Sequence, residues 1–357
     1  MKKRYIAIIV TNLAGSGAEK IALMQAKMFR ENGHNVVLFL LDNIIAYDTD
    51  NFDFPIITLT NKKDKYKFLG KIGDKIYANI LNKKMNEFGT FDTVISNLPR
   101  ADRVVKQLNH PNKYFVIHMS YKAELEKFKK RRAKRKLKLY RYLYTDENII
   151  TVAKAIIADF DILNIKYKKA TTIYNPFDFK EIRQKGDEAI ELNYDYIISP
   201  SAFRTQKRYD VMLDAVKLLK TDIKLLILAK VNSELTEMIR SRGLEQRVKI
   251  LGFQQNPYKY IKKAKLLVLS SDREGLPTII IESLILGTPV VSTDCPTGPK
   301  EILRDDLSFW LVQMENPKKL AEKIDKALTR EIKINDDIIA RFHKDYIYKE
   351  YEQLCLK

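Results

Sequence analysis

The chain alternates short runs of β-branched and aromatic residues with longer amphipathic runs, and it does so in two successive series. In the first series, residues 19–31 and 67–87 have the helical periodicity expected of segments that cover a sheet. The predicted strands of this series are Tyr5–Val10, Asn35–Leu41, Thr93–Ser96, Tyr114–His118 and Asn148–Val152. Strands that alternate with helices predict an α/β fold with a parallel, doubly wound sheet.

The alternation pauses at Asn175-Pro176 and over the polar residues 180–193, and then begins again. The second series predicts strands at Tyr196–Ser199, Lys224–Leu228, Val248–Leu251, Leu266–Leu269, Val290–Ser292 and Phe309–Val312. It predicts helices at Tyr209–Leu219, Leu235–Arg242, Pro277–Leu286 and Pro317–Leu328. We therefore expect two Rossmann-like domains, residues 1–178 and 190–335, and a C-terminal helix at 336–357 that could pack back on the first. Ligands of such sheets bind beyond the carboxyl ends of the strands, so two facing domains would enclose a cleft.

Composition narrows the class of protein. A chain of 357 residues with 45% hydrophobic residues fits two domains with real cores. The two cysteines, Cys295 and Cys355, suggest neither a disulfide framework nor a metal site. The apolar run Tyr5–Val10 is too short for a signal-peptide core, and no run of about 18 apolar residues could span a membrane. The sequence thus predicts a cytoplasmic protein, and its net charge of +19 indicates an acidic partner.

Two glutamates, Glu274 and Glu282, lie on either side of a predicted helix start at Pro277. The free N–H groups of a first helical turn, together with the helix dipole, favour an anion at that point. A diphosphate bound there would have one carboxylate on the side of a sugar and one on the side of a ribose. Carboxylates only accept hydrogen bonds, so both suit the recognition of hydroxyl pairs. From the pattern alone, two ordinary helix charges fit equally well.

The surrounding residues favour the first interpretation. Residues 271–303 read SDREGLPTIIIESLILGTPVVSTDCPTGPKEIL, which resembles the nucleotide-sugar signature of family 4 glycosyltransferases. The stretch 294–303 is similar to the branch that builds lipopolysaccharide cores and surface polysaccharides. A weaker similarity extends over most of the chain, including the first loop, Asn175-Pro176 and Gly252-Phe253.

This resemblance implies a GT-B fold, retention of configuration at the anomeric carbon, no required metal, and no cofactor besides a nucleotide-sugar donor, UDP-linked by preference. It implies that Glu274 contacts the donor sugar and that Glu282 binds the ribose. The diphosphate is then held by the backbone of Gly275, Leu276, Pro277 and Thr278.

The resemblance assigns roles to four further loops. Gly17, in the loop NLAGSGAEK, would lie near the donor phosphate, although a plain tight turn explains that glycine too. His118 ends a strand, and its imidazole would donate a hydrogen bond to a sugar hydroxyl; a structural histidine is the alternative interpretation. Phe253 follows a predicted strand and would meet the base. Apart from the resemblance, Ser96–Arg100 ends a predicted strand on the cleft side of the first domain and could meet the acceptor.

The fourth loop to which the resemblance assigns a role follows the first strand of the second series and reads PSAFRTQKRYD. The family uses an arginine and a lysine there to neutralise the departing diphosphate. Lys207 matches the lysine, whereas Ala202 occupies the arginine position. Arg204, two residues along, is the candidate substitute. A basic surface turn without a role is the alternative.

Residues 127–138, KFKKRRAKRKLK, contain no acidic side chain. Such a run is commonly a solvated helix face, but an amphipathic basic helix also binds anionic bilayers. We expect peripheral association with the inner face of a bacterial inner membrane, where a lipid-linked acceptor would be found.

The leading hypothesis is a glycosyltransferase that moves a hexose or N-acetylhexosamine to a lipopolysaccharide-core, capsule or lipid-linked glycan. The net charge also fits a nucleic-acid-binding protein, but no RRM, KH or helix-turn-helix signature is found, so no nucleic-acid partner is expected. A nonhydrolysing epimerase or a phosphorylase on the same fold is the third hypothesis.

Overall fold

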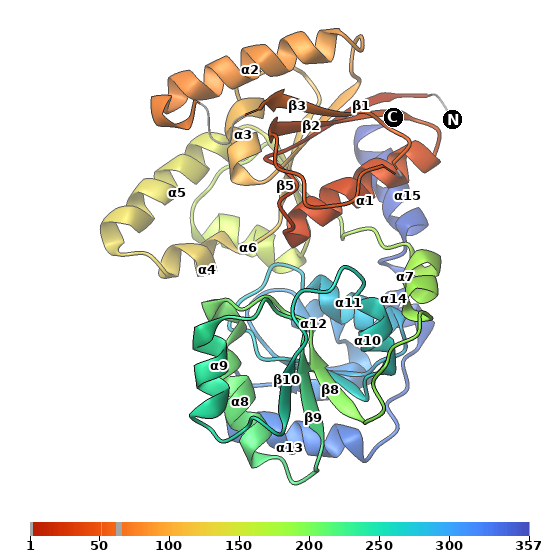
Figure 1. Cartoon of the computed structure of the whole chain (residues 1–357). Helices are drawn as coiled ribbons and strands as arrows, with labels where there is room; N and C mark the ends of the chain where they lie inside the picture. Colours follow the sequence, from red (N-terminus) through yellow and green to blue (C-terminus); the bar gives the residue numbers. More distant parts are fainter. Residues whose placement is uncertain (1–2, 51, 62–65, 357) are drawn as a thin grey trace. The chain divides into compact units, whose positions relative to one another are not determined.

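The computed structural model describes residues 3–50, 52–61 and 66–356, and the chain divides into two compact units (Figure 1). The first unit comprises residues 1–177 together with 342–357, and the second comprises residues 178–341. Within the described residues, no helix combines the length and the apolar character needed to cross a membrane.

The first unit is built on a parallel sheet with the strand order β3-β2-β1-β4-β5-β6-β7. Its strands are β1 Tyr5–Val10, β2 Asn35–Asp42, β3 Ile56–Thr60, β4 Thr93–Asn97, β5 Lys113–Ile117, β6 Asn148–Thr151 and β7 Lys169–Thr172. Its helices are α1 Gly17–Glu31, α2 Lys71–Asn86, α3 Pro99–Val105, α4 Tyr121–Glu126, α5 Lys130–Tyr144, α6 Lys154–Ile162 and α15 Lys344–Cys355, with a 3₁₀ turn η1 at Lys67–Leu69. In Figure 1, α15 (blue) lies against α1 (red), so the C-terminal helix completes the N-terminal unit.

Strand β1 is the centre of this sheet, because it pairs in parallel with β2 on one side and β4 on the other. Its residues Ile6–Val10 are fully buried, which explains why they form a continuous apolar run rather than an alternating one. The parallel register brings Asp42, Asn97 and His118 to the same end of the sheet, at the carboxyl ends of β2, β4 and β5.

The second unit has a parallel sheet with the order β10-β9-β8-β11-β12-β13. Its strands are β8 Tyr196–Ser199, β9 Lys224–Ile227, β10 Val248–Ile250, β11 Leu266–Leu269, β12 Val290–Thr293 and β13 Leu311–Val312. Its helices are α7 Phe179–Gly186, α8 Tyr209–Leu218, α9 Ser233–Arg240, α10 Tyr258–Lys263, α11 Thr278–Ile285, α12 Pro299–Ile302, α13 Pro317–Leu328 and α14 Asp336–Ala340, with 3₁₀ turns η2 Thr205–Lys207 and η3 Asp305–Trp310. The strand order reverses between β8 and β11, and such a switch point is where doubly wound sheets bind ligands.

The prediction of an α/β fold with two doubly wound parallel sheets is confirmed. The predicted helix at 67–87 is interrupted at Gly70, whose φ of 56° ends the turn η1 before α2 begins. The polar residues 180–193 contain an unexpected helix, α7, which begins where the Asp178 carboxylate accepts a hydrogen bond from the Glu181 N–H.

The prediction of one C-terminal helix at 336–357 is wrong. Helix α14 ends at Ala340 and α15 begins at Lys344, and the two belong to different units. The break is fixed locally, because the His343 ring accepts a hydrogen bond from the Asp345 N–H at the start of α15. Phe177 also pairs with this segment, since its N–H donates to the Phe342 carbonyl and its carbonyl accepts from the Lys344 N–H.

Candidate functional site

Two loops meet at the switch point of the second unit. Lys207 ends η2, after β8, and Glu274 lies in the loop after β11. The Lys207 Nζ is 2.6 Å from the Glu274 Oε1, and these side chains are only 18% and 13% exposed. The Ser270 hydroxyl holds the loops together by donating to the Lys207 carbonyl at 2.7 Å. A cation and a carboxylate are therefore fixed beside each other at the carboxyl ends of adjacent strands.

Helix α11 starts directly after this loop. Pro277 has an extended conformation and caps the helix, so the first helical residue is Thr278, one later than predicted. The Ile280 N–H donates to the Pro277 carbonyl, which closes the first turn. The remaining N–H groups at this end and the helix dipole favour an anion near Glu274 and Lys207.

Glu282 lies within α11 and is 3% exposed. The Tyr258 hydroxyl, from α10, donates to the Glu282 Oε1 at 3.1 Å. The carboxylate is thus oriented by a buried tyrosine rather than left on a solvated helix face. This finding argues against the interpretation of Glu282 as an ordinary helix charge.

Two residues that support the loop of Glu274, Thr297 and Gly298, were not predicted from the sequence. The Thr297 hydroxyl donates to the Glu274 carbonyl. Gly298 has a φ of 92°, and a Cβ there would lie 2.3 Å from the Pro277 Cδ and 2.6 Å from the Gly275 carbonyl oxygen. The loop that carries Glu274 therefore rests on a backbone where only glycine fits. The sequence did contain a signal, because both residues lie in the stretch that resembles the family.

Residues 180–344 match the family model described as "Glycosyl transferases group 1". The match covers a little under half of the chain, and it makes this part of the chain similar to a group 1 glycosyltransferase domain. All the contacts of Lys207, Glu274 and Glu282 described above lie within it.

Curated relatives show the same similarity. The chain is 33% identical over 184 residues to an N-acetylgalactosamine-N,N'-diacetylbacillosaminyl-diphospho-undecaprenol 4-alpha-N-acetylgalactosaminyltransferase of Campylobacter jejuni, which covers 51% of this chain and 49% of that protein. It is 28% identical over 189 residues to a lipopolysaccharide 1,6-galactosyltransferase of Escherichia coli, covering 51% and 53%. The chain thus spans about half the length of the curated relatives it matches.

Solved structures extend the similarity to the whole fold. The structure of Anabaena Alr3699/HepE in complex with UDP and glucose has a TM-score of 0.80 at 18% identity and covers 98% of each chain. The lipopolysaccharide outer core galactosyltransferase WaaB, in its apo form, has a TM-score of 0.69 at 18% identity and also covers 98% of each. These similarities confirm the predicted GT-B fold.

Arg204 and Phe253, two further predicted site residues of the group 1 domain, are exposed. Arg204 precedes η2, and its carbonyl accepts a hydrogen bond from the Lys207 N–H at 2.9 Å. Ala202, at the expected arginine position, is exposed too. Arg208 forms ion pairs with Asp210 and Glu315, and these carboxylates raise the pKa of its guanidinium. Phe253 follows β10 and is 71% exposed. Among the described residues, no hydrogen bond or ion pair joins Arg204 or Phe253 to Glu274, so the roles of Arg204 and Phe253 stay predictions.

In the first unit, His118 is held by a chain of hydrogen bonds. The Asn97 Nδ2 donates to the Gln25 Oε1, and the Gln25 Nε2 donates to the Tyr351 hydroxyl. The Asn97 Oδ1 therefore faces His118, where it lies 2.7 Å from Nε2. An amide oxygen can only accept, so the Nε2 of His118 carries the proton.

Burial also lowers the pKa of His118 to about 4, which keeps the imidazole neutral near pH 7. With the proton on Nε2, the Nδ1 of His118 is a hydrogen-bond acceptor. The prediction was that this ring donates a hydrogen bond to a sugar hydroxyl. The geometry instead supports a ring that accepts a hydrogen bond from one.

The loop around Gly17 differs from the predicted anion site in one respect. The Glu19 carboxylate already accepts hydrogen bonds from the N–H groups of Gly15 and Ser16, at 2.8 and 2.9 Å. Gly17 is the first residue of α1, and a Cβ there would meet no atom within 4 Å. The glycine therefore leaves open space, while its neighbouring amides are used by the helix cap.

Arg100, predicted within the acceptor loop 96–100, is also engaged. It forms an ion pair with Asp42 at the carboxyl end of β2, and its Nη2 donates to the Tyr77 hydroxyl at 3.2 Å. Asp42 is fully buried, so this pair ties α3 to β2. Among the described residues, no cluster of three or more His, Cys, Asp or Glu side chains could hold a metal ion.

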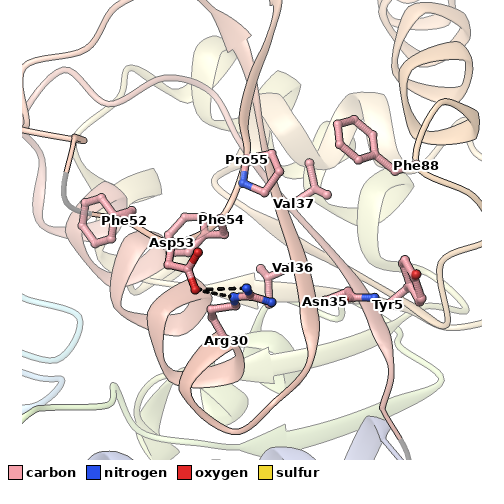
Figure 2. Close-up of a pocket in the computed structure, with 10 residues that line it drawn as sticks. All are labelled: Tyr5, Arg30, Asn35, Val36, Val37, Phe52, Asp53, Phe54, Pro55 and Phe88. Carbon is pink, nitrogen blue, oxygen red and sulfur yellow. Dashed lines mark hydrogen bonds and ion pairs between the residues drawn. The ribbon is translucent and has the colours of Figure 1, made fainter.

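Figure 2 shows a hollow of about 520 Å³ at the opposite end of the first sheet. It lies at the amino ends of β1 and β2, beside Tyr5 and Asn35. The Arg30–Asp53 ion pair crosses it. Doubly wound sheets bind their ligands at the carboxyl ends of the strands, and none of the predicted site residues lines this hollow. We therefore assign it no part in the chemistry.

Proposed function

We propose that the chain is a retaining, metal-independent glycosyltransferase that transfers a hexose or N-acetylhexosamine from a UDP-sugar. The proposed acceptor is a lipopolysaccharide-core, capsule or lipid-linked glycan. The observation that carries the proposal is the Lys207–Glu274 pair at the start of α11, inside the group 1 domain. The UDP of the HepE structure and the surface-glycan acceptors in the relatives' names support the choice of substrates.

The diphosphate of the donor binds at the N-terminal end of α11, where N–H groups and the helix dipole favour negative charge. Lys207 supplies the positive charge that stabilises the leaving nucleotide. Its ammonium is already in place against Glu274 before charge develops, so little reorganisation opposes the reaction. Arg204 supplies a second positive charge and replaces the family's arginine, whose position Ala202 occupies.

Glu274 positions the sugar rather than attacking it. Its Oε1 already accepts a charged hydrogen bond from Lys207, which lowers the nucleophilicity of that oxygen. Glu282, oriented by Tyr258, accepts hydrogen bonds from the ribose hydroxyls. The neutral His118 accepts a hydrogen bond from a sugar hydroxyl through Nδ1. We infer a same-face displacement. Its rate depends on the positioning of the donor sugar and on the stabilisation of the negative charge that develops on the leaving nucleotide.

A peripheral position on the inner face of a bacterial inner membrane completes the proposal. Helix α5 contains most of the basic residues of 127–138. Anionic headgroups attract such a helix, and a lipid-linked acceptor would be present in the same bilayer.

The experiment is a donor screen. The purified chain is incubated with a panel of UDP-, GDP- and CMP-sugars, with and without EDTA, and the released sugar is analysed by NMR for its anomeric configuration. We expect UDP-sugar turnover that is insensitive to EDTA and that retains configuration. Glu274→Gln should lower turnover at least about a hundredfold, whereas Glu315→Gln, an exposed glutamate of the same unit, should not. An inverted product, or full activity of Glu274→Gln, would refute the mechanism. Release of an epimerised sugar or of a sugar phosphate would point to the epimerase or the phosphorylase instead.

A further inference from the structure

Helix α5 is fixed in its rotation about its own axis. Tyr140, Leu143 and Tyr144 are buried on its inner face. The Tyr144 hydroxyl donates to the Asp102 carboxylate at 2.7 Å, and the Tyr140 ring stacks on that of Tyr121 with centroids 4.0 Å apart. The side chains opposite this face must therefore point to solvent.

Some basic residues of α5 make ion pairs or ring contacts among the described residues, and others do not. Lys136 is used internally, since its Nζ lies 2.6 Å from the Glu124 Oε1. Arg132 lies over the Phe128 ring, 4.2 Å from its centroid. Arg131, Arg135 and Lys138 are exposed, and no ion pair of the described residues includes them. Their spacing of four and three residues puts them on one helix face, and we call these three residues the basic stripe.

Tyr142 continues the basic stripe by one more helical turn and is 40% exposed. The Gln107 side chain donates to its hydroxyl at 2.9 Å. Lys71, the first residue of α2, lies over its ring, with Nζ 4.8 Å from the centroid. The basic stripe is thereby joined to the start of α2, a segment about 60–70 residues away in the sequence.

The turn η1 and the start of α2 expose apolar side chains on either side of Lys71. Phe68 is 83% exposed, Ile72 is 64% exposed and Leu69 is 36% exposed. We call these three residues the apolar tip. Single exposed hydrophobic residues are common, but three within five residues of sequence, next to a basic stripe that makes no ion pair among the described residues, form a surface of the kind that marks an interaction site.

We propose that the basic stripe and the apolar tip together form one surface that binds an anionic phospholipid bilayer. The stripe contacts the headgroups, and the tip inserts between them. Tyr142, with an apolar ring and a polar hydroxyl, is suited to the boundary between the two. This inference deepens the proposed function, on which it rests for the membrane-linked acceptor, and it adds α2 to the basic run as a contact.

The two parts make separable contributions. Each basic residue near an anionic surface strengthens binding about fivefold, so neutralising the stripe should weaken it about a hundredfold. Binding through the stripe should also fall as salt rises, because it is screened. Loss of the tip should weaken binding about equally at low and high salt, because apolar burial is not screened.

The test is flotation with vesicles of phosphatidylcholine and phosphatidylglycerol, compared with phosphatidylcholine alone, for the full chain. The stripe variant is Arg131→Gln, Arg135→Gln and Lys138→Gln, and the tip variant is Phe68→Ser and Ile72→Ser. Matched controls on exposed sites of the second unit are Lys217→Gln, Lys220→Gln and Lys249→Gln for charge, and Leu218→Ser and Val231→Ser for apolar surface. UDP binding is measured on every preparation to show that each is folded.

We expect wild type and both controls to float with the anionic vesicles and both site variants to lose most of that binding. If the control variants lose as much as the site variants, or if the tip variant binds like wild type, the surface is wrong. Binding to RNA in preference to the anionic vesicles would also overturn it. The proposed function fails separately: vesicle binding without sugar transfer would refute the activity and leave the surface intact.

Discussion

Gly298 offers a sharp test of how the loop around Glu274 is supported. The substitution Gly298→Ala adds a methyl group 2.3 Å from the Pro277 Cδ, 2.6 Å from the Gly275 carbonyl oxygen and 3.2 Å from the Leu276 Cα. The first atom is in a rigid ring and the other two belong to the backbone, so none can rotate away. The backbone of residues 275–277 must then shift from the start of α11.

The cost has two parts. A left-handed conformation disfavours alanine by about 1–2 kcal/mol, and overpacking adds about 1–3 kcal/mol. Gly243→Ala separates them, because Gly243 has a φ of 67° and no atom within 4 Å of its missing Cβ. It should lose only the cost of a positive φ, so the difference between the variants reports the close approach together with the added cost of the ψ of −60° at Gly298.

Two assays follow from this comparison. Urea unfolding should give Gly298→Ala a free energy of unfolding about 1–3 kcal/mol lower than that of Gly243→Ala. Calorimetric titration with UDP should show at least a tenfold weaker affinity for Gly298→Ala and a wild-type affinity for Gly243→Ala, since a shift of the loop misplaces the phosphate-binding backbone. Equal behaviour of the two variants in both assays would refute the proposed support.

Three further predictions concern charge. Asn97→Asp puts a carboxylate against the His118 Nε2, and at an effective dielectric constant of 20 this charge favours the imidazolium by about 4 kcal/mol. The pKa of His118 measured by NMR titration should therefore rise well above 4. An unchanged titration curve would contradict the hydrogen-bond assignment. The pKa of His118 rises from about 4 in the folded state to its ordinary value of 6.5 on unfolding, so the unfolded state binds more protons between these two pH values. Stability should therefore fall as the pH is lowered from 6.5 towards 4, and His118→Gln should flatten that slope in urea titrations. Lys207→Met removes the cation beside Glu274 and should lower kcat about 10²–10³-fold with UDP-sugars. The control Lys319→Met replaces an exposed lysine of the same unit and should keep the wild-type kcat. Equal rates for the two variants would exclude Lys207 from leaving-group stabilisation.

The sequence predicted the central strands and the switch-point loop because these depend on local pattern. Ile6–Val10 and Leu266–Leu269 are apolar throughout, as strands buried on both faces must be. The two edge strands of the first sheet, β3 and β7, were missed. Both are partly exposed, and Lys169–Thr172 at β7 is also polar, so it looks like a loop. The segment 180–193 was taken for a pause because α7 has a single large buried apolar residue, Ile182.

Contacts between residues far apart in the sequence could not be predicted from pattern. Lys207 meets Glu274 because β8 and β11 are neighbours, which depends on the strand order of the whole sheet. The same applies to Tyr351, which reaches His118 through Gln25 and Asn97 only because α15 packs against α1. Glu19, a plain helix-start residue in the sequence, occupies two amides of the loop that was expected to bind an anion.

The central claim is that α11 holds a nucleotide, with the Glu282 carboxylate on its ribose. The most direct measurement is a calorimetric cycle of UDP and 2′,3′-dideoxy-UDP against wild type and Glu282→Gln. Hydrogen bonds to a charged acceptor contribute about 1.5–3 kcal/mol, so wild type should prefer UDP by at least about tenfold. Glu282→Gln should lose most of that preference while binding dideoxy-UDP as wild type does. If the preference for UDP survives in Glu282→Gln, or if wild type shows none, Glu282 does not bind the ribose and the site is wrongly placed.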